Sequence, residues 1–256
     1  MPARQRHRLW ISLLPALAMS ATLPASQAAG DQARPDPRLV YTAQSPDWLG
    51  AVGKLRVPGI KWREGRRTHH REDCSATLVA AGARNDADII ITAWHCLEFY
   101  SDLSQAITFT LFPDSDQPIS SEAYRLADGG GMHADWAILK LHQPVARERV
   151  SSMNINPGVL DVAQNIVMAG YSSDRALGQA GKHLTYDPDC RVTRQSAGNG
   201  ESDCLAYKGA SGGAVVQLSA DGKAWLSGVI SQGDGATLST FVPVTGFRSA
   251  IRRHLN

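Results

Sequence analysis

From Cys74 onward the sequence is a succession of short apolar runs separated by turn-forming residues, and this alternation restricts the fold more than any other feature. Val, Ile, Thr and aromatic residues dominate the runs, whereas Gly, Asp, Asn and Pro lie between them. The runs cover residues 75–81, 89–93, 107–112, 136–141, 165–169, 214–218, 225–230 and 240–244. Residues 245–256 instead have a helical period, with apolar Phe247, Ile251 and Leu255. The pattern predicts an all-β sandwich or barrel that ends in a short helix.

The length of 256 residues allows one large domain or two small ones. Residues 147–158 lack strand character and include Asn, Pro and Gly, so we expect them to connect two halves of similar size. The predicted halves are residues 48–146 and residues 159–256. A formal net charge of only +2 gives no reason to expect nucleic acid or an anionic membrane as a partner.

The N-terminus has the pattern of a secretory signal peptide. Three arginines in the first eight residues precede an apolar run over 9–23, and small residues follow over 25–29. Pro15 interrupts the run and Pro24 follows it, and the run is also short for a membrane span of about 20 apolar residues. We therefore expect cleavage near Ala28 or Ala29 and removal of residues 1–29. The remaining chain should be secreted or periplasmic, without a membrane partner.

Two further segments have unusual composition. Residues 30–47 show no periodicity and are rich in Pro, Asp, Gln and Ala, which is typical of a mature leader or a short pro-segment. Residues 63–71, Arg-Glu-Gly-Arg-Arg-Thr-His-His-Arg, form the one strong charge run. A solvated loop between strands is the simplest interpretation, and a processing site or an anion-binding patch are the alternatives.

The four cysteines favour disulfides if the chain is exported to an oxidising compartment. Three pairings are possible, and the pairing of sequence neighbours joins Cys74 to Cys96 and Cys190 to Cys204. Each short loop would contribute about 3 kcal/mol. A zinc site is the alternative, but no C-x-x-C or H-x-x-x-H pair is present. We expect neither a metal nor another cofactor.

The first candidate catalytic residue is His95, which follows the apolar run 90–94 and precedes Cys96. A disulfide at Cys96 would fix the backbone around the imidazole. A general base needs such anchoring in order to stay within hydrogen-bond reach of a nucleophile. Taken alone, a histidine at a strand end is more often structural.

The second candidate is Asp135, at the start of the apolar run 136–141. A carboxylate there would be partly buried and would need a partner. A histidine N–H is one such partner, and accepting it would orient the imidazole and stabilise its charged form. A strand-capping or turn aspartate is the alternative for this motif alone.

The third candidate is Ser211, within the small-residue segment Lys-Gly-Ala-Ser-Gly-Gly-Ala-Val at 208–215. Small neighbours would let a substrate carbonyl approach the backbone closely. The N–H groups of Gly209 and Ser211 would then point at a developing oxyanion. A glycine-rich turn before a strand is the alternative.

Together, in the order His, Asp, Ser, these motifs resemble those of the trypsin/chymotrypsin-like serine peptidases, and especially secreted bacterial members. Thr-Ala-x-His-Cys, Asp-x-Ala-Ile-Leu and Gly-x-Ser-Gly-Gly all match. Residues 74–78 are similar to the strand whose cysteine bridges to the one after the catalytic histidine. Residues 228–233 are similar to the strand that pairs with bound peptide. Residues 241–244, followed by a helical tail, are similar to the end of the family's chains. The resemblance covers about residues 48–256.

The resemblance implies two perpendicular six-stranded β-barrels with the active site between them. His95 and Asp135 would come from the first barrel and Ser211 from the second, which Cys190 and Cys204 would bridge. It further implies a monomeric serine endopeptidase that acts on proteins or peptides and needs no cofactor.

The resemblance also indicates which residues would contact substrate: Leu205, Ser231, Gln232, Gly233 and Ser239. Leu205 stands where a trypsin has its pocket aspartate, and Ser239 lies near the opposite wall, which disfavours Arg or Lys specificity. Gln232 replaces the customary tryptophan. Ile230 stands where some glutamate-specific relatives have a histidine. We expect an apolar or small side chain before the scissile bond.

Ala210 departs from the digestive enzymes of this family, which have an aspartate at that position. That aspartate receives the new N-terminus on activation. Because alanine has no carboxylate, the usual zymogen ion pair cannot form here. Either the loop that carries the oxyanion donors is ordered in another way, or the enzyme is synthesised in its active form and needs no activation.

Two other functions fit parts of the pattern. Residues 209–213 match the G-x-S-x-G elbow of α/β-hydrolase esterases, but that fold requires an acid and then a histidine after the serine. His254 is the only histidine after Ser211. A non-catalytic binding or adhesion module on the same scaffold is the alternative from a different class, because a fold alone does not establish activity.

Overall fold

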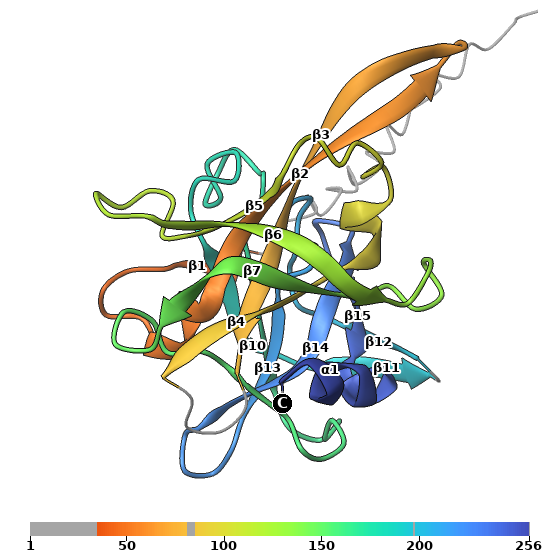
Figure 1. Ribbon diagram of the computed structural model, residues 1–256. Coiled ribbons are helices and arrows are strands. Elements are labelled where there is room, and N and C mark those ends of the chain that lie inside the picture. The colour runs from red at the N-terminus through yellow and green to blue at the C-terminus, as the bar shows by residue number, and fades with distance from the viewer. Residues whose placement is uncertain (1–34, 81–84, 197, 256) are drawn as a thin grey trace, which may run out of the picture. The chain divides into compact units, whose positions relative to one another are not determined.

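The computed structural model describes residues 35–80, 85–196 and 198–255 (Figure 1). The predicted signal peptide, residues 1–29, lies outside the described residues. The protein is mostly β, with three short 3₁₀ helices and one α-helix in its described part. In that part, no helix is long and apolar enough to cross a membrane.

The first half is a closed, antiparallel six-stranded barrel in the order β2-β3-β4-β7-β6-β5. Its strands are β2 (Val52–Arg63), β3 (Arg66–Val79), β4 (Asp86–Thr92), β5 (Ile107–Leu111), β6 (Ile119–Asp128) and β7 (Ala137–Ala146). Burial alternates along β5, where Ile107, Phe109 and Leu111 are buried and the threonines between them are not. This two-residue period fills the barrel interior with apolar side chains.

The second half is a nine-stranded sheet in the order β1-β10-β9-β13-β14-β15-β12-β11, with β8 parallel to β14. Its strands are β1 (Leu39–Val40), β8 (Asn154–Ile155), β9 (Ile166–Gly170), β10 (Thr185–Cys190), β11 (Val192–Ser196), β12 (Asn199–Ser202), β13 (Ala214–Leu218), β14 (Ala224–Gly233) and β15 (Ser239–Pro243). The all-β fold class is thus confirmed, but this half is a sheet with two ends rather than a closed ring of six strands. Within the described residues, β10 pairs with β9 on one edge and with β1 on the other, and no strand pair joins β11 to β10.

The charge run at 63–71 is part of a long hairpin rather than a loop. The register of β2 and β3 continues to the pair Arg63↔Arg66, so that only Glu64 and Gly65 form the turn. Both turn residues have positive φ, 50° and 74°, as a two-residue hairpin turn with the right-handed strand twist requires. Figure 1 shows this hairpin, in orange, extending well beyond the rest of the barrel.

The predicted C-terminal helix is present as α1 (Arg248–Leu255), which follows the short 3₁₀ helix η3 (Val244–Gly246). Ala250, Ile251 and Leu255 are buried on one face. Phe247, just before the helix, stacks on Trp136 with ring centroids 4.9 Å apart. Because Trp136 immediately precedes β7, this contact attaches the end of the chain to the first barrel.

Candidate active site

His95 lies in the short 3₁₀ helix η2 (Trp94–Leu97), which begins just after β4. A disulfide joins Cys74 on β3 to Cys96 beside the histidine, and a second joins Cys190 to Cys204. Sequence-local pairing is therefore the one found. The His95 backbone N–H donates to Asp135 Oδ1 at 2.9 Å, and ring Nδ1 lies 2.8 Å from Asp135 Oδ2. The carboxylate thus fixes both the backbone and the ring of the histidine.

Asp135 is fully buried, with 0% of its surface exposed. The Ser231 hydroxyl adds a third contact by donating to Asp135 Oδ2 at 2.5 Å. Burial opposes the charge, but the hydrogen bonds from His95 and Ser231 outweigh it and hold the pKa of Asp135 below its usual range. The carboxylate is therefore ionised at neutral pH and suited to stabilise a protonated imidazole.

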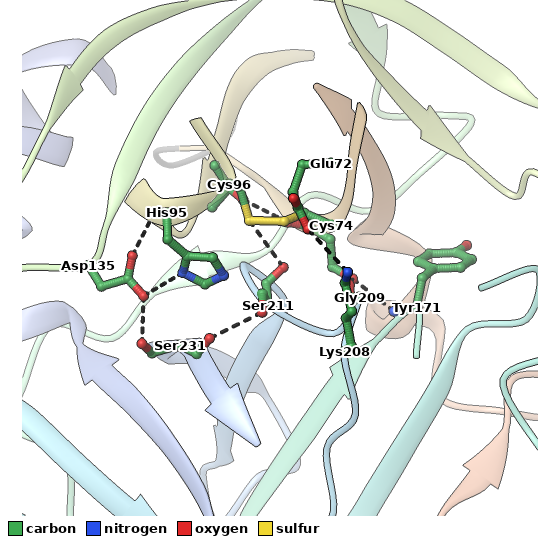
Figure 2. The surroundings of a disulfide bond; sticks show 12 residues. Glu72, Cys74, His95, Cys96, Asp135, Tyr171, Lys208, Gly209, Ser211 and Ser231 are labelled. Atoms are coloured by element: carbon green, nitrogen blue, oxygen red, sulfur yellow. Dashed lines mark hydrogen bonds and ion pairs between the residues drawn. A yellow bond between two sulfur atoms is a disulfide. The ribbon is translucent and has the colours of Figure 1, made fainter. Parts of the chain in front are cut away.

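Ser211 is at the end of a tight loop that runs from Tyr207 to β13. Figure 2 shows the His95 ring between the Asp135 carboxylate and Ser211. The Ser211 hydroxyl donates to the Ser231 carbonyl at 3.1 Å. Its neighbour Gly212 has φ +82°, and a Cβ there would lie 2.2 Å from the Ser75 carbonyl oxygen. Only glycine allows the serine to approach the first barrel this closely.

We call residues 207–211 the oxyanion loop, because it contains the two predicted donors. Gly209 has φ +93°. In the described part of the chain, no hydrogen bond engages the N–H of Gly209 or of Ser211. Both residues line a cavity of about 500 Å³ together with His95. The two N–H groups are thus free to bind an oxygen of a ligand in that cavity.

Ser75, a buried residue on β3, holds the oxyanion loop through two hydrogen bonds and accepts a third from Tyr171. Its N–H donates to the Ser211 carbonyl and its hydroxyl donates to the Gly209 carbonyl, both at 2.8 Å. The same hydroxyl accepts the N–H of Tyr171 at 2.8 Å. Ser75 therefore connects the first barrel to both donor residues of the loop.

The predicted substrate residues divide into two groups. Gln232 and Gly233 line the cavity with His95 and Ser211. Leu205, Ser231 and Ser239 are not part of its lining. The Ser239 hydroxyl donates instead to the Cys204 carbonyl at 2.8 Å, and the Leu205 N–H donates to Asp187 Oδ2 at 2.9 Å. Ser231 instead bonds to two candidate catalytic groups: its hydroxyl donates to Asp135 and its carbonyl accepts from Ser211.

The cavity also contains charged residues that the sequence patterns did not single out: Glu72, Asp73, Lys208 and Asp234. The Asp234 carboxylate accepts the N–H groups of residues 236, 237 and 238, and these bonds lower its pKa to about 2. Lys208 could have been predicted as a cavity residue, because it stands next to the serine motif in the sequence. The others are brought to the cavity by strand pairing and turns, which no local pattern reveals.

Cys74, His95 and Cys96 have potential metal-ligating atoms within 4.8 Å of one another. The two sulfurs are bonded to each other in the disulfide, and a metal requires the thiolate form of cysteine. His95 is further engaged with Asp135. This cluster therefore lacks the ligands for a metal ion.

Comparison with known proteins identifies the class to which this fold and site belong. The family model described as Trypsin matches residues 63–251, and the chain belongs to this family. No curated protein matches the sequence.

Two solved structures are similar in fold. The one described as "Structure of GrC" has 18% identity and a TM-score of 0.60, and the match covers 82% of this chain and 96% of that one. Glu endopeptidase in complex with MPD has 16% identity and a TM-score of 0.61, with 86% and 97% covered. At such low identity these likenesses establish the chymotrypsin-like fold, and the chemistry must be argued from the site.

Proposed function

We propose that this protein is a serine endopeptidase in which Ser211 is the nucleophile, His95 the general base and Asp135 the residue that orients His95. The observation that carries this proposal is the arrangement around one cavity. A buried carboxylate contacts a histidine, and a serine lies beside that histidine. Gly209 and Ser211, whose N–H groups make no hydrogen bond within the described residues, line the same cavity. These are the parts that acyl transfer through a serine requires.

In the proposed reaction, Ser211 Oγ attacks the peptide carbonyl carbon while His95 Nε2 takes the hydroxyl proton. The N–H groups of Gly209 and Ser211 bind the resulting oxyanion. His95 then gives the proton to the leaving amine as the C–N bond breaks, which leaves an acyl ester on Ser211. Water attacks this ester with His95 again as base, releasing the carboxylic acid and restoring the serine.

Without substrate, the Ser211 hydroxyl donates its hydrogen bond to the Ser231 carbonyl rather than to His95. We expect the hydroxyl to exchange this partner for His95 Nε2 when substrate binds. Hydrogen bonds between catalytic groups are commonly long or misaligned in free enzymes and tighten in the substrate complex.

Protein or peptide chains are the proposed substrates, and the proposed location is outside the cytoplasm. The Trypsin family membership supports the first, and the two disulfides support the second because such bonds persist in oxidising compartments. An apolar or small side chain before the scissile bond is the proposed preference. The apolar Leu238, which lines the cavity with His95 and Ser211, supports it.

The test is hydrolysis of casein and of a peptide library by the full chain and by Ser211→Ala. Removing the nucleophile should lower kcat by about 10⁵-fold or more. Ser219→Ala is the matched control, because Ser219 is a half-buried serine in the turn between β13 and β14, away from the cavity lining. A folded protein without hydrolytic activity, or a Ser211→Ala variant as active as the parent, would contradict the proposal and favour a non-catalytic binding module.

A further inference from the structure

Arg38 is a charged side chain buried near the start of the described chain. Its side chain is only 1% exposed and forms ion pairs with two carboxylates, Asp36 at 2.7 Å and Asp174 at 2.9 Å. Nε also donates to Asp36 Oδ1 at 3.0 Å. The flat guanidinium lies over the ring of Tyr207, with its central carbon 4.2 Å from the ring centroid. A charge buried this completely is tolerated only with such partners.

Arg38 is connected to the oxyanion loop through two of its contacts, Asp174 and Tyr207. Tyr207 is the first residue of that loop, and its carbonyl accepts the Ala210 N–H at 3.0 Å. Asp174 is adjacent to Ser173, whose N–H and hydroxyl both donate to the Lys208 carbonyl at 2.7 Å. Arg38 therefore supports the loop at two consecutive residues, once through an aromatic ring and once through the neighbouring segment.

Ala210, by contrast, is surrounded by nonpolar groups. It is 2% exposed, belongs to an apolar cluster with Met168 and Val215, and packs against Gly170. This position holds no carboxylate for an N-terminal amine.

We propose that Arg38 is a positioning residue that orders the oxyanion loop, so that an internal side chain does what a newly cut N-terminal amine does in activated zymogens. This inference rests on the proposed peptidase function. Arg38 is well placed for the role because β1 begins at the next residue and pairs with β10, as Leu39↔Tyr186 and Val40↔Thr185. The chain would thus need no new N-terminus to become active.

The proposal also decides between the two interpretations of residues 30–47. A pro-segment that included Arg38 would take the loop's support with it when removed. The active form should therefore retain residues 36–47, and cleavage after Arg38 should inactivate it rather than activate it.

The test compares kcat and KM of full-chain Arg38→Gln, Arg38→Lys and Asp174→Asn on one peptide substrate, well below their melting temperatures. Arg38→Gln should lower kcat by about 10²-fold, the effect of a lost oxyanion donor, and leave KM nearly unchanged because the donors act in the transition state. Lysine should restore part of this loss, since it retains the charge without the planar fork. Lys140→Met, which removes an ion pair on the outside of the first barrel, is the control.

A second readout does not depend on activity. Amide hydrogen exchange at Ala210 and Ser173, whose N–H groups bond to the Tyr207 and Lys208 carbonyls, should be faster in Arg38→Gln and Asp174→Asn than in the parent, with the barrel amides unchanged. A chain that carries extra residues before its N-terminus should retain the parental kcat.

Three results would overturn the proposal. They are a folded Arg38→Gln with parental kcat and loop exchange, a kcat loss that only follows the unfolded fraction, and an activity that requires a free amine at a defined position. If Arg38→Gln does not fold, the isosteric Asp174→Asn carries the same test. A parent that is inactive, or an active Ser211→Ala, would instead refute the peptidase function itself.

Discussion

The two halves of the candidate site are held in different ways. His95 and Asp135 both come from the closed barrel, contact each other directly, and are joined to β3 through the Cys74–Cys96 disulfide. The oxyanion loop belongs to the nine-stranded sheet, and its carbonyls are held by Ser75 from the barrel and Ser173 from a neighbouring segment. Both residues of the candidate acid–base pair thus come from one barrel, although Ser231 of the sheet also donates to Asp135. The position of the proposed nucleophile and of the proposed oxyanion donors depends instead on polar contacts between distant segments.

The largest effect should come from breaking the pair within the barrel. Asp135→Asn preserves the shape of the side chain but favours the wrong imidazole tautomer, and should lower kcat by about 10⁴-fold. Steady-state kinetics on a peptide substrate measure this loss. Asp88→Asn, at the surface ion pair with Lys140, should leave kcat unchanged. An Asp135→Asn variant that keeps more than a tenth of the activity would show that His95 does not depend on this carboxylate.

A smaller effect should come from breaking the contact that holds the oxyanion loop. Ser75→Ala leaves the Tyr171 N–H and the Gly209 carbonyl without their buried partner. Such a loss lowers the free energy of unfolding by about 1–3 kcal/mol, and the loosened loop should lower kcat by up to about 10²-fold. Urea unfolding and kinetics measure the two effects separately.

The same strand offers a matched control for this prediction. Thr77 lies two residues along β3, is 1% exposed, and its buried hydroxyl has no hydrogen-bond partner in the described part of the chain. Thr77→Val should therefore be neutral or stabilising, because it removes a buried polar group that makes no bond. Equal effects of Ser75→Ala and Thr77→Val on kcat would show that Ser75 acts only as a packed side chain.

Acid should weaken the support of the oxyanion loop without the need for any mutation. The Arg38 guanidinium holds the pKa of Asp36 below its ordinary 3.8. Burial raises the pKa of Asp174, but hydrogen bonds from Arg38 and the backbone outweigh it and lower that pKa as well. Groups whose pKa is lower in the folded state stabilise it above their unfolded pKa and lose this contribution as pH falls through the folded value.

The stability difference between parent and Arg38→Gln should accordingly be largest near neutral pH and shrink below pH 3.8. Unfolding midpoints measured from pH 7 to about pH 2.5 test this expectation, because carboxylates titrate within that interval. A difference that does not change with pH would show that Arg38 stabilises the fold by packing rather than through its carboxylate partners.

The candidate catalytic residues were accessible from sequence because each sits in its own local pattern. His95 follows an apolar run and precedes a cysteine, Asp135 precedes an apolar strand, and Ser211 lies among glycines. The strand runs likewise predicted an all-β chain with a terminal helix, which the structure confirms. A local pattern could not predict the open path of the second sheet, since it depends on β1 occupying one edge of β10.

The supporting residues were not accessible for the same reason. The Ser75 hydroxyl bonds to a carbonyl 134 residues away in sequence, and Arg38 contacts Asp174 at a separation of 136. Nothing around either residue distinguishes it from an ordinary polar residue. The resemblance also indicated Leu205 and Ser239 as substrate contacts, and neither lines the cavity around His95 and Ser211, because the side-chain directions depend on tertiary packing that a motif does not show.

The most direct test of the central claim is reaction of the folded full chain with a fluorophosphonate probe, followed by peptide mass spectrometry. The account predicts one adduct per chain, on Ser211, which disappears in Ser211→Ala and forms far more slowly in Asp135→Asn. No adduct on folded protein, or an adduct on a different serine that persists in Ser211→Ala, would contradict it.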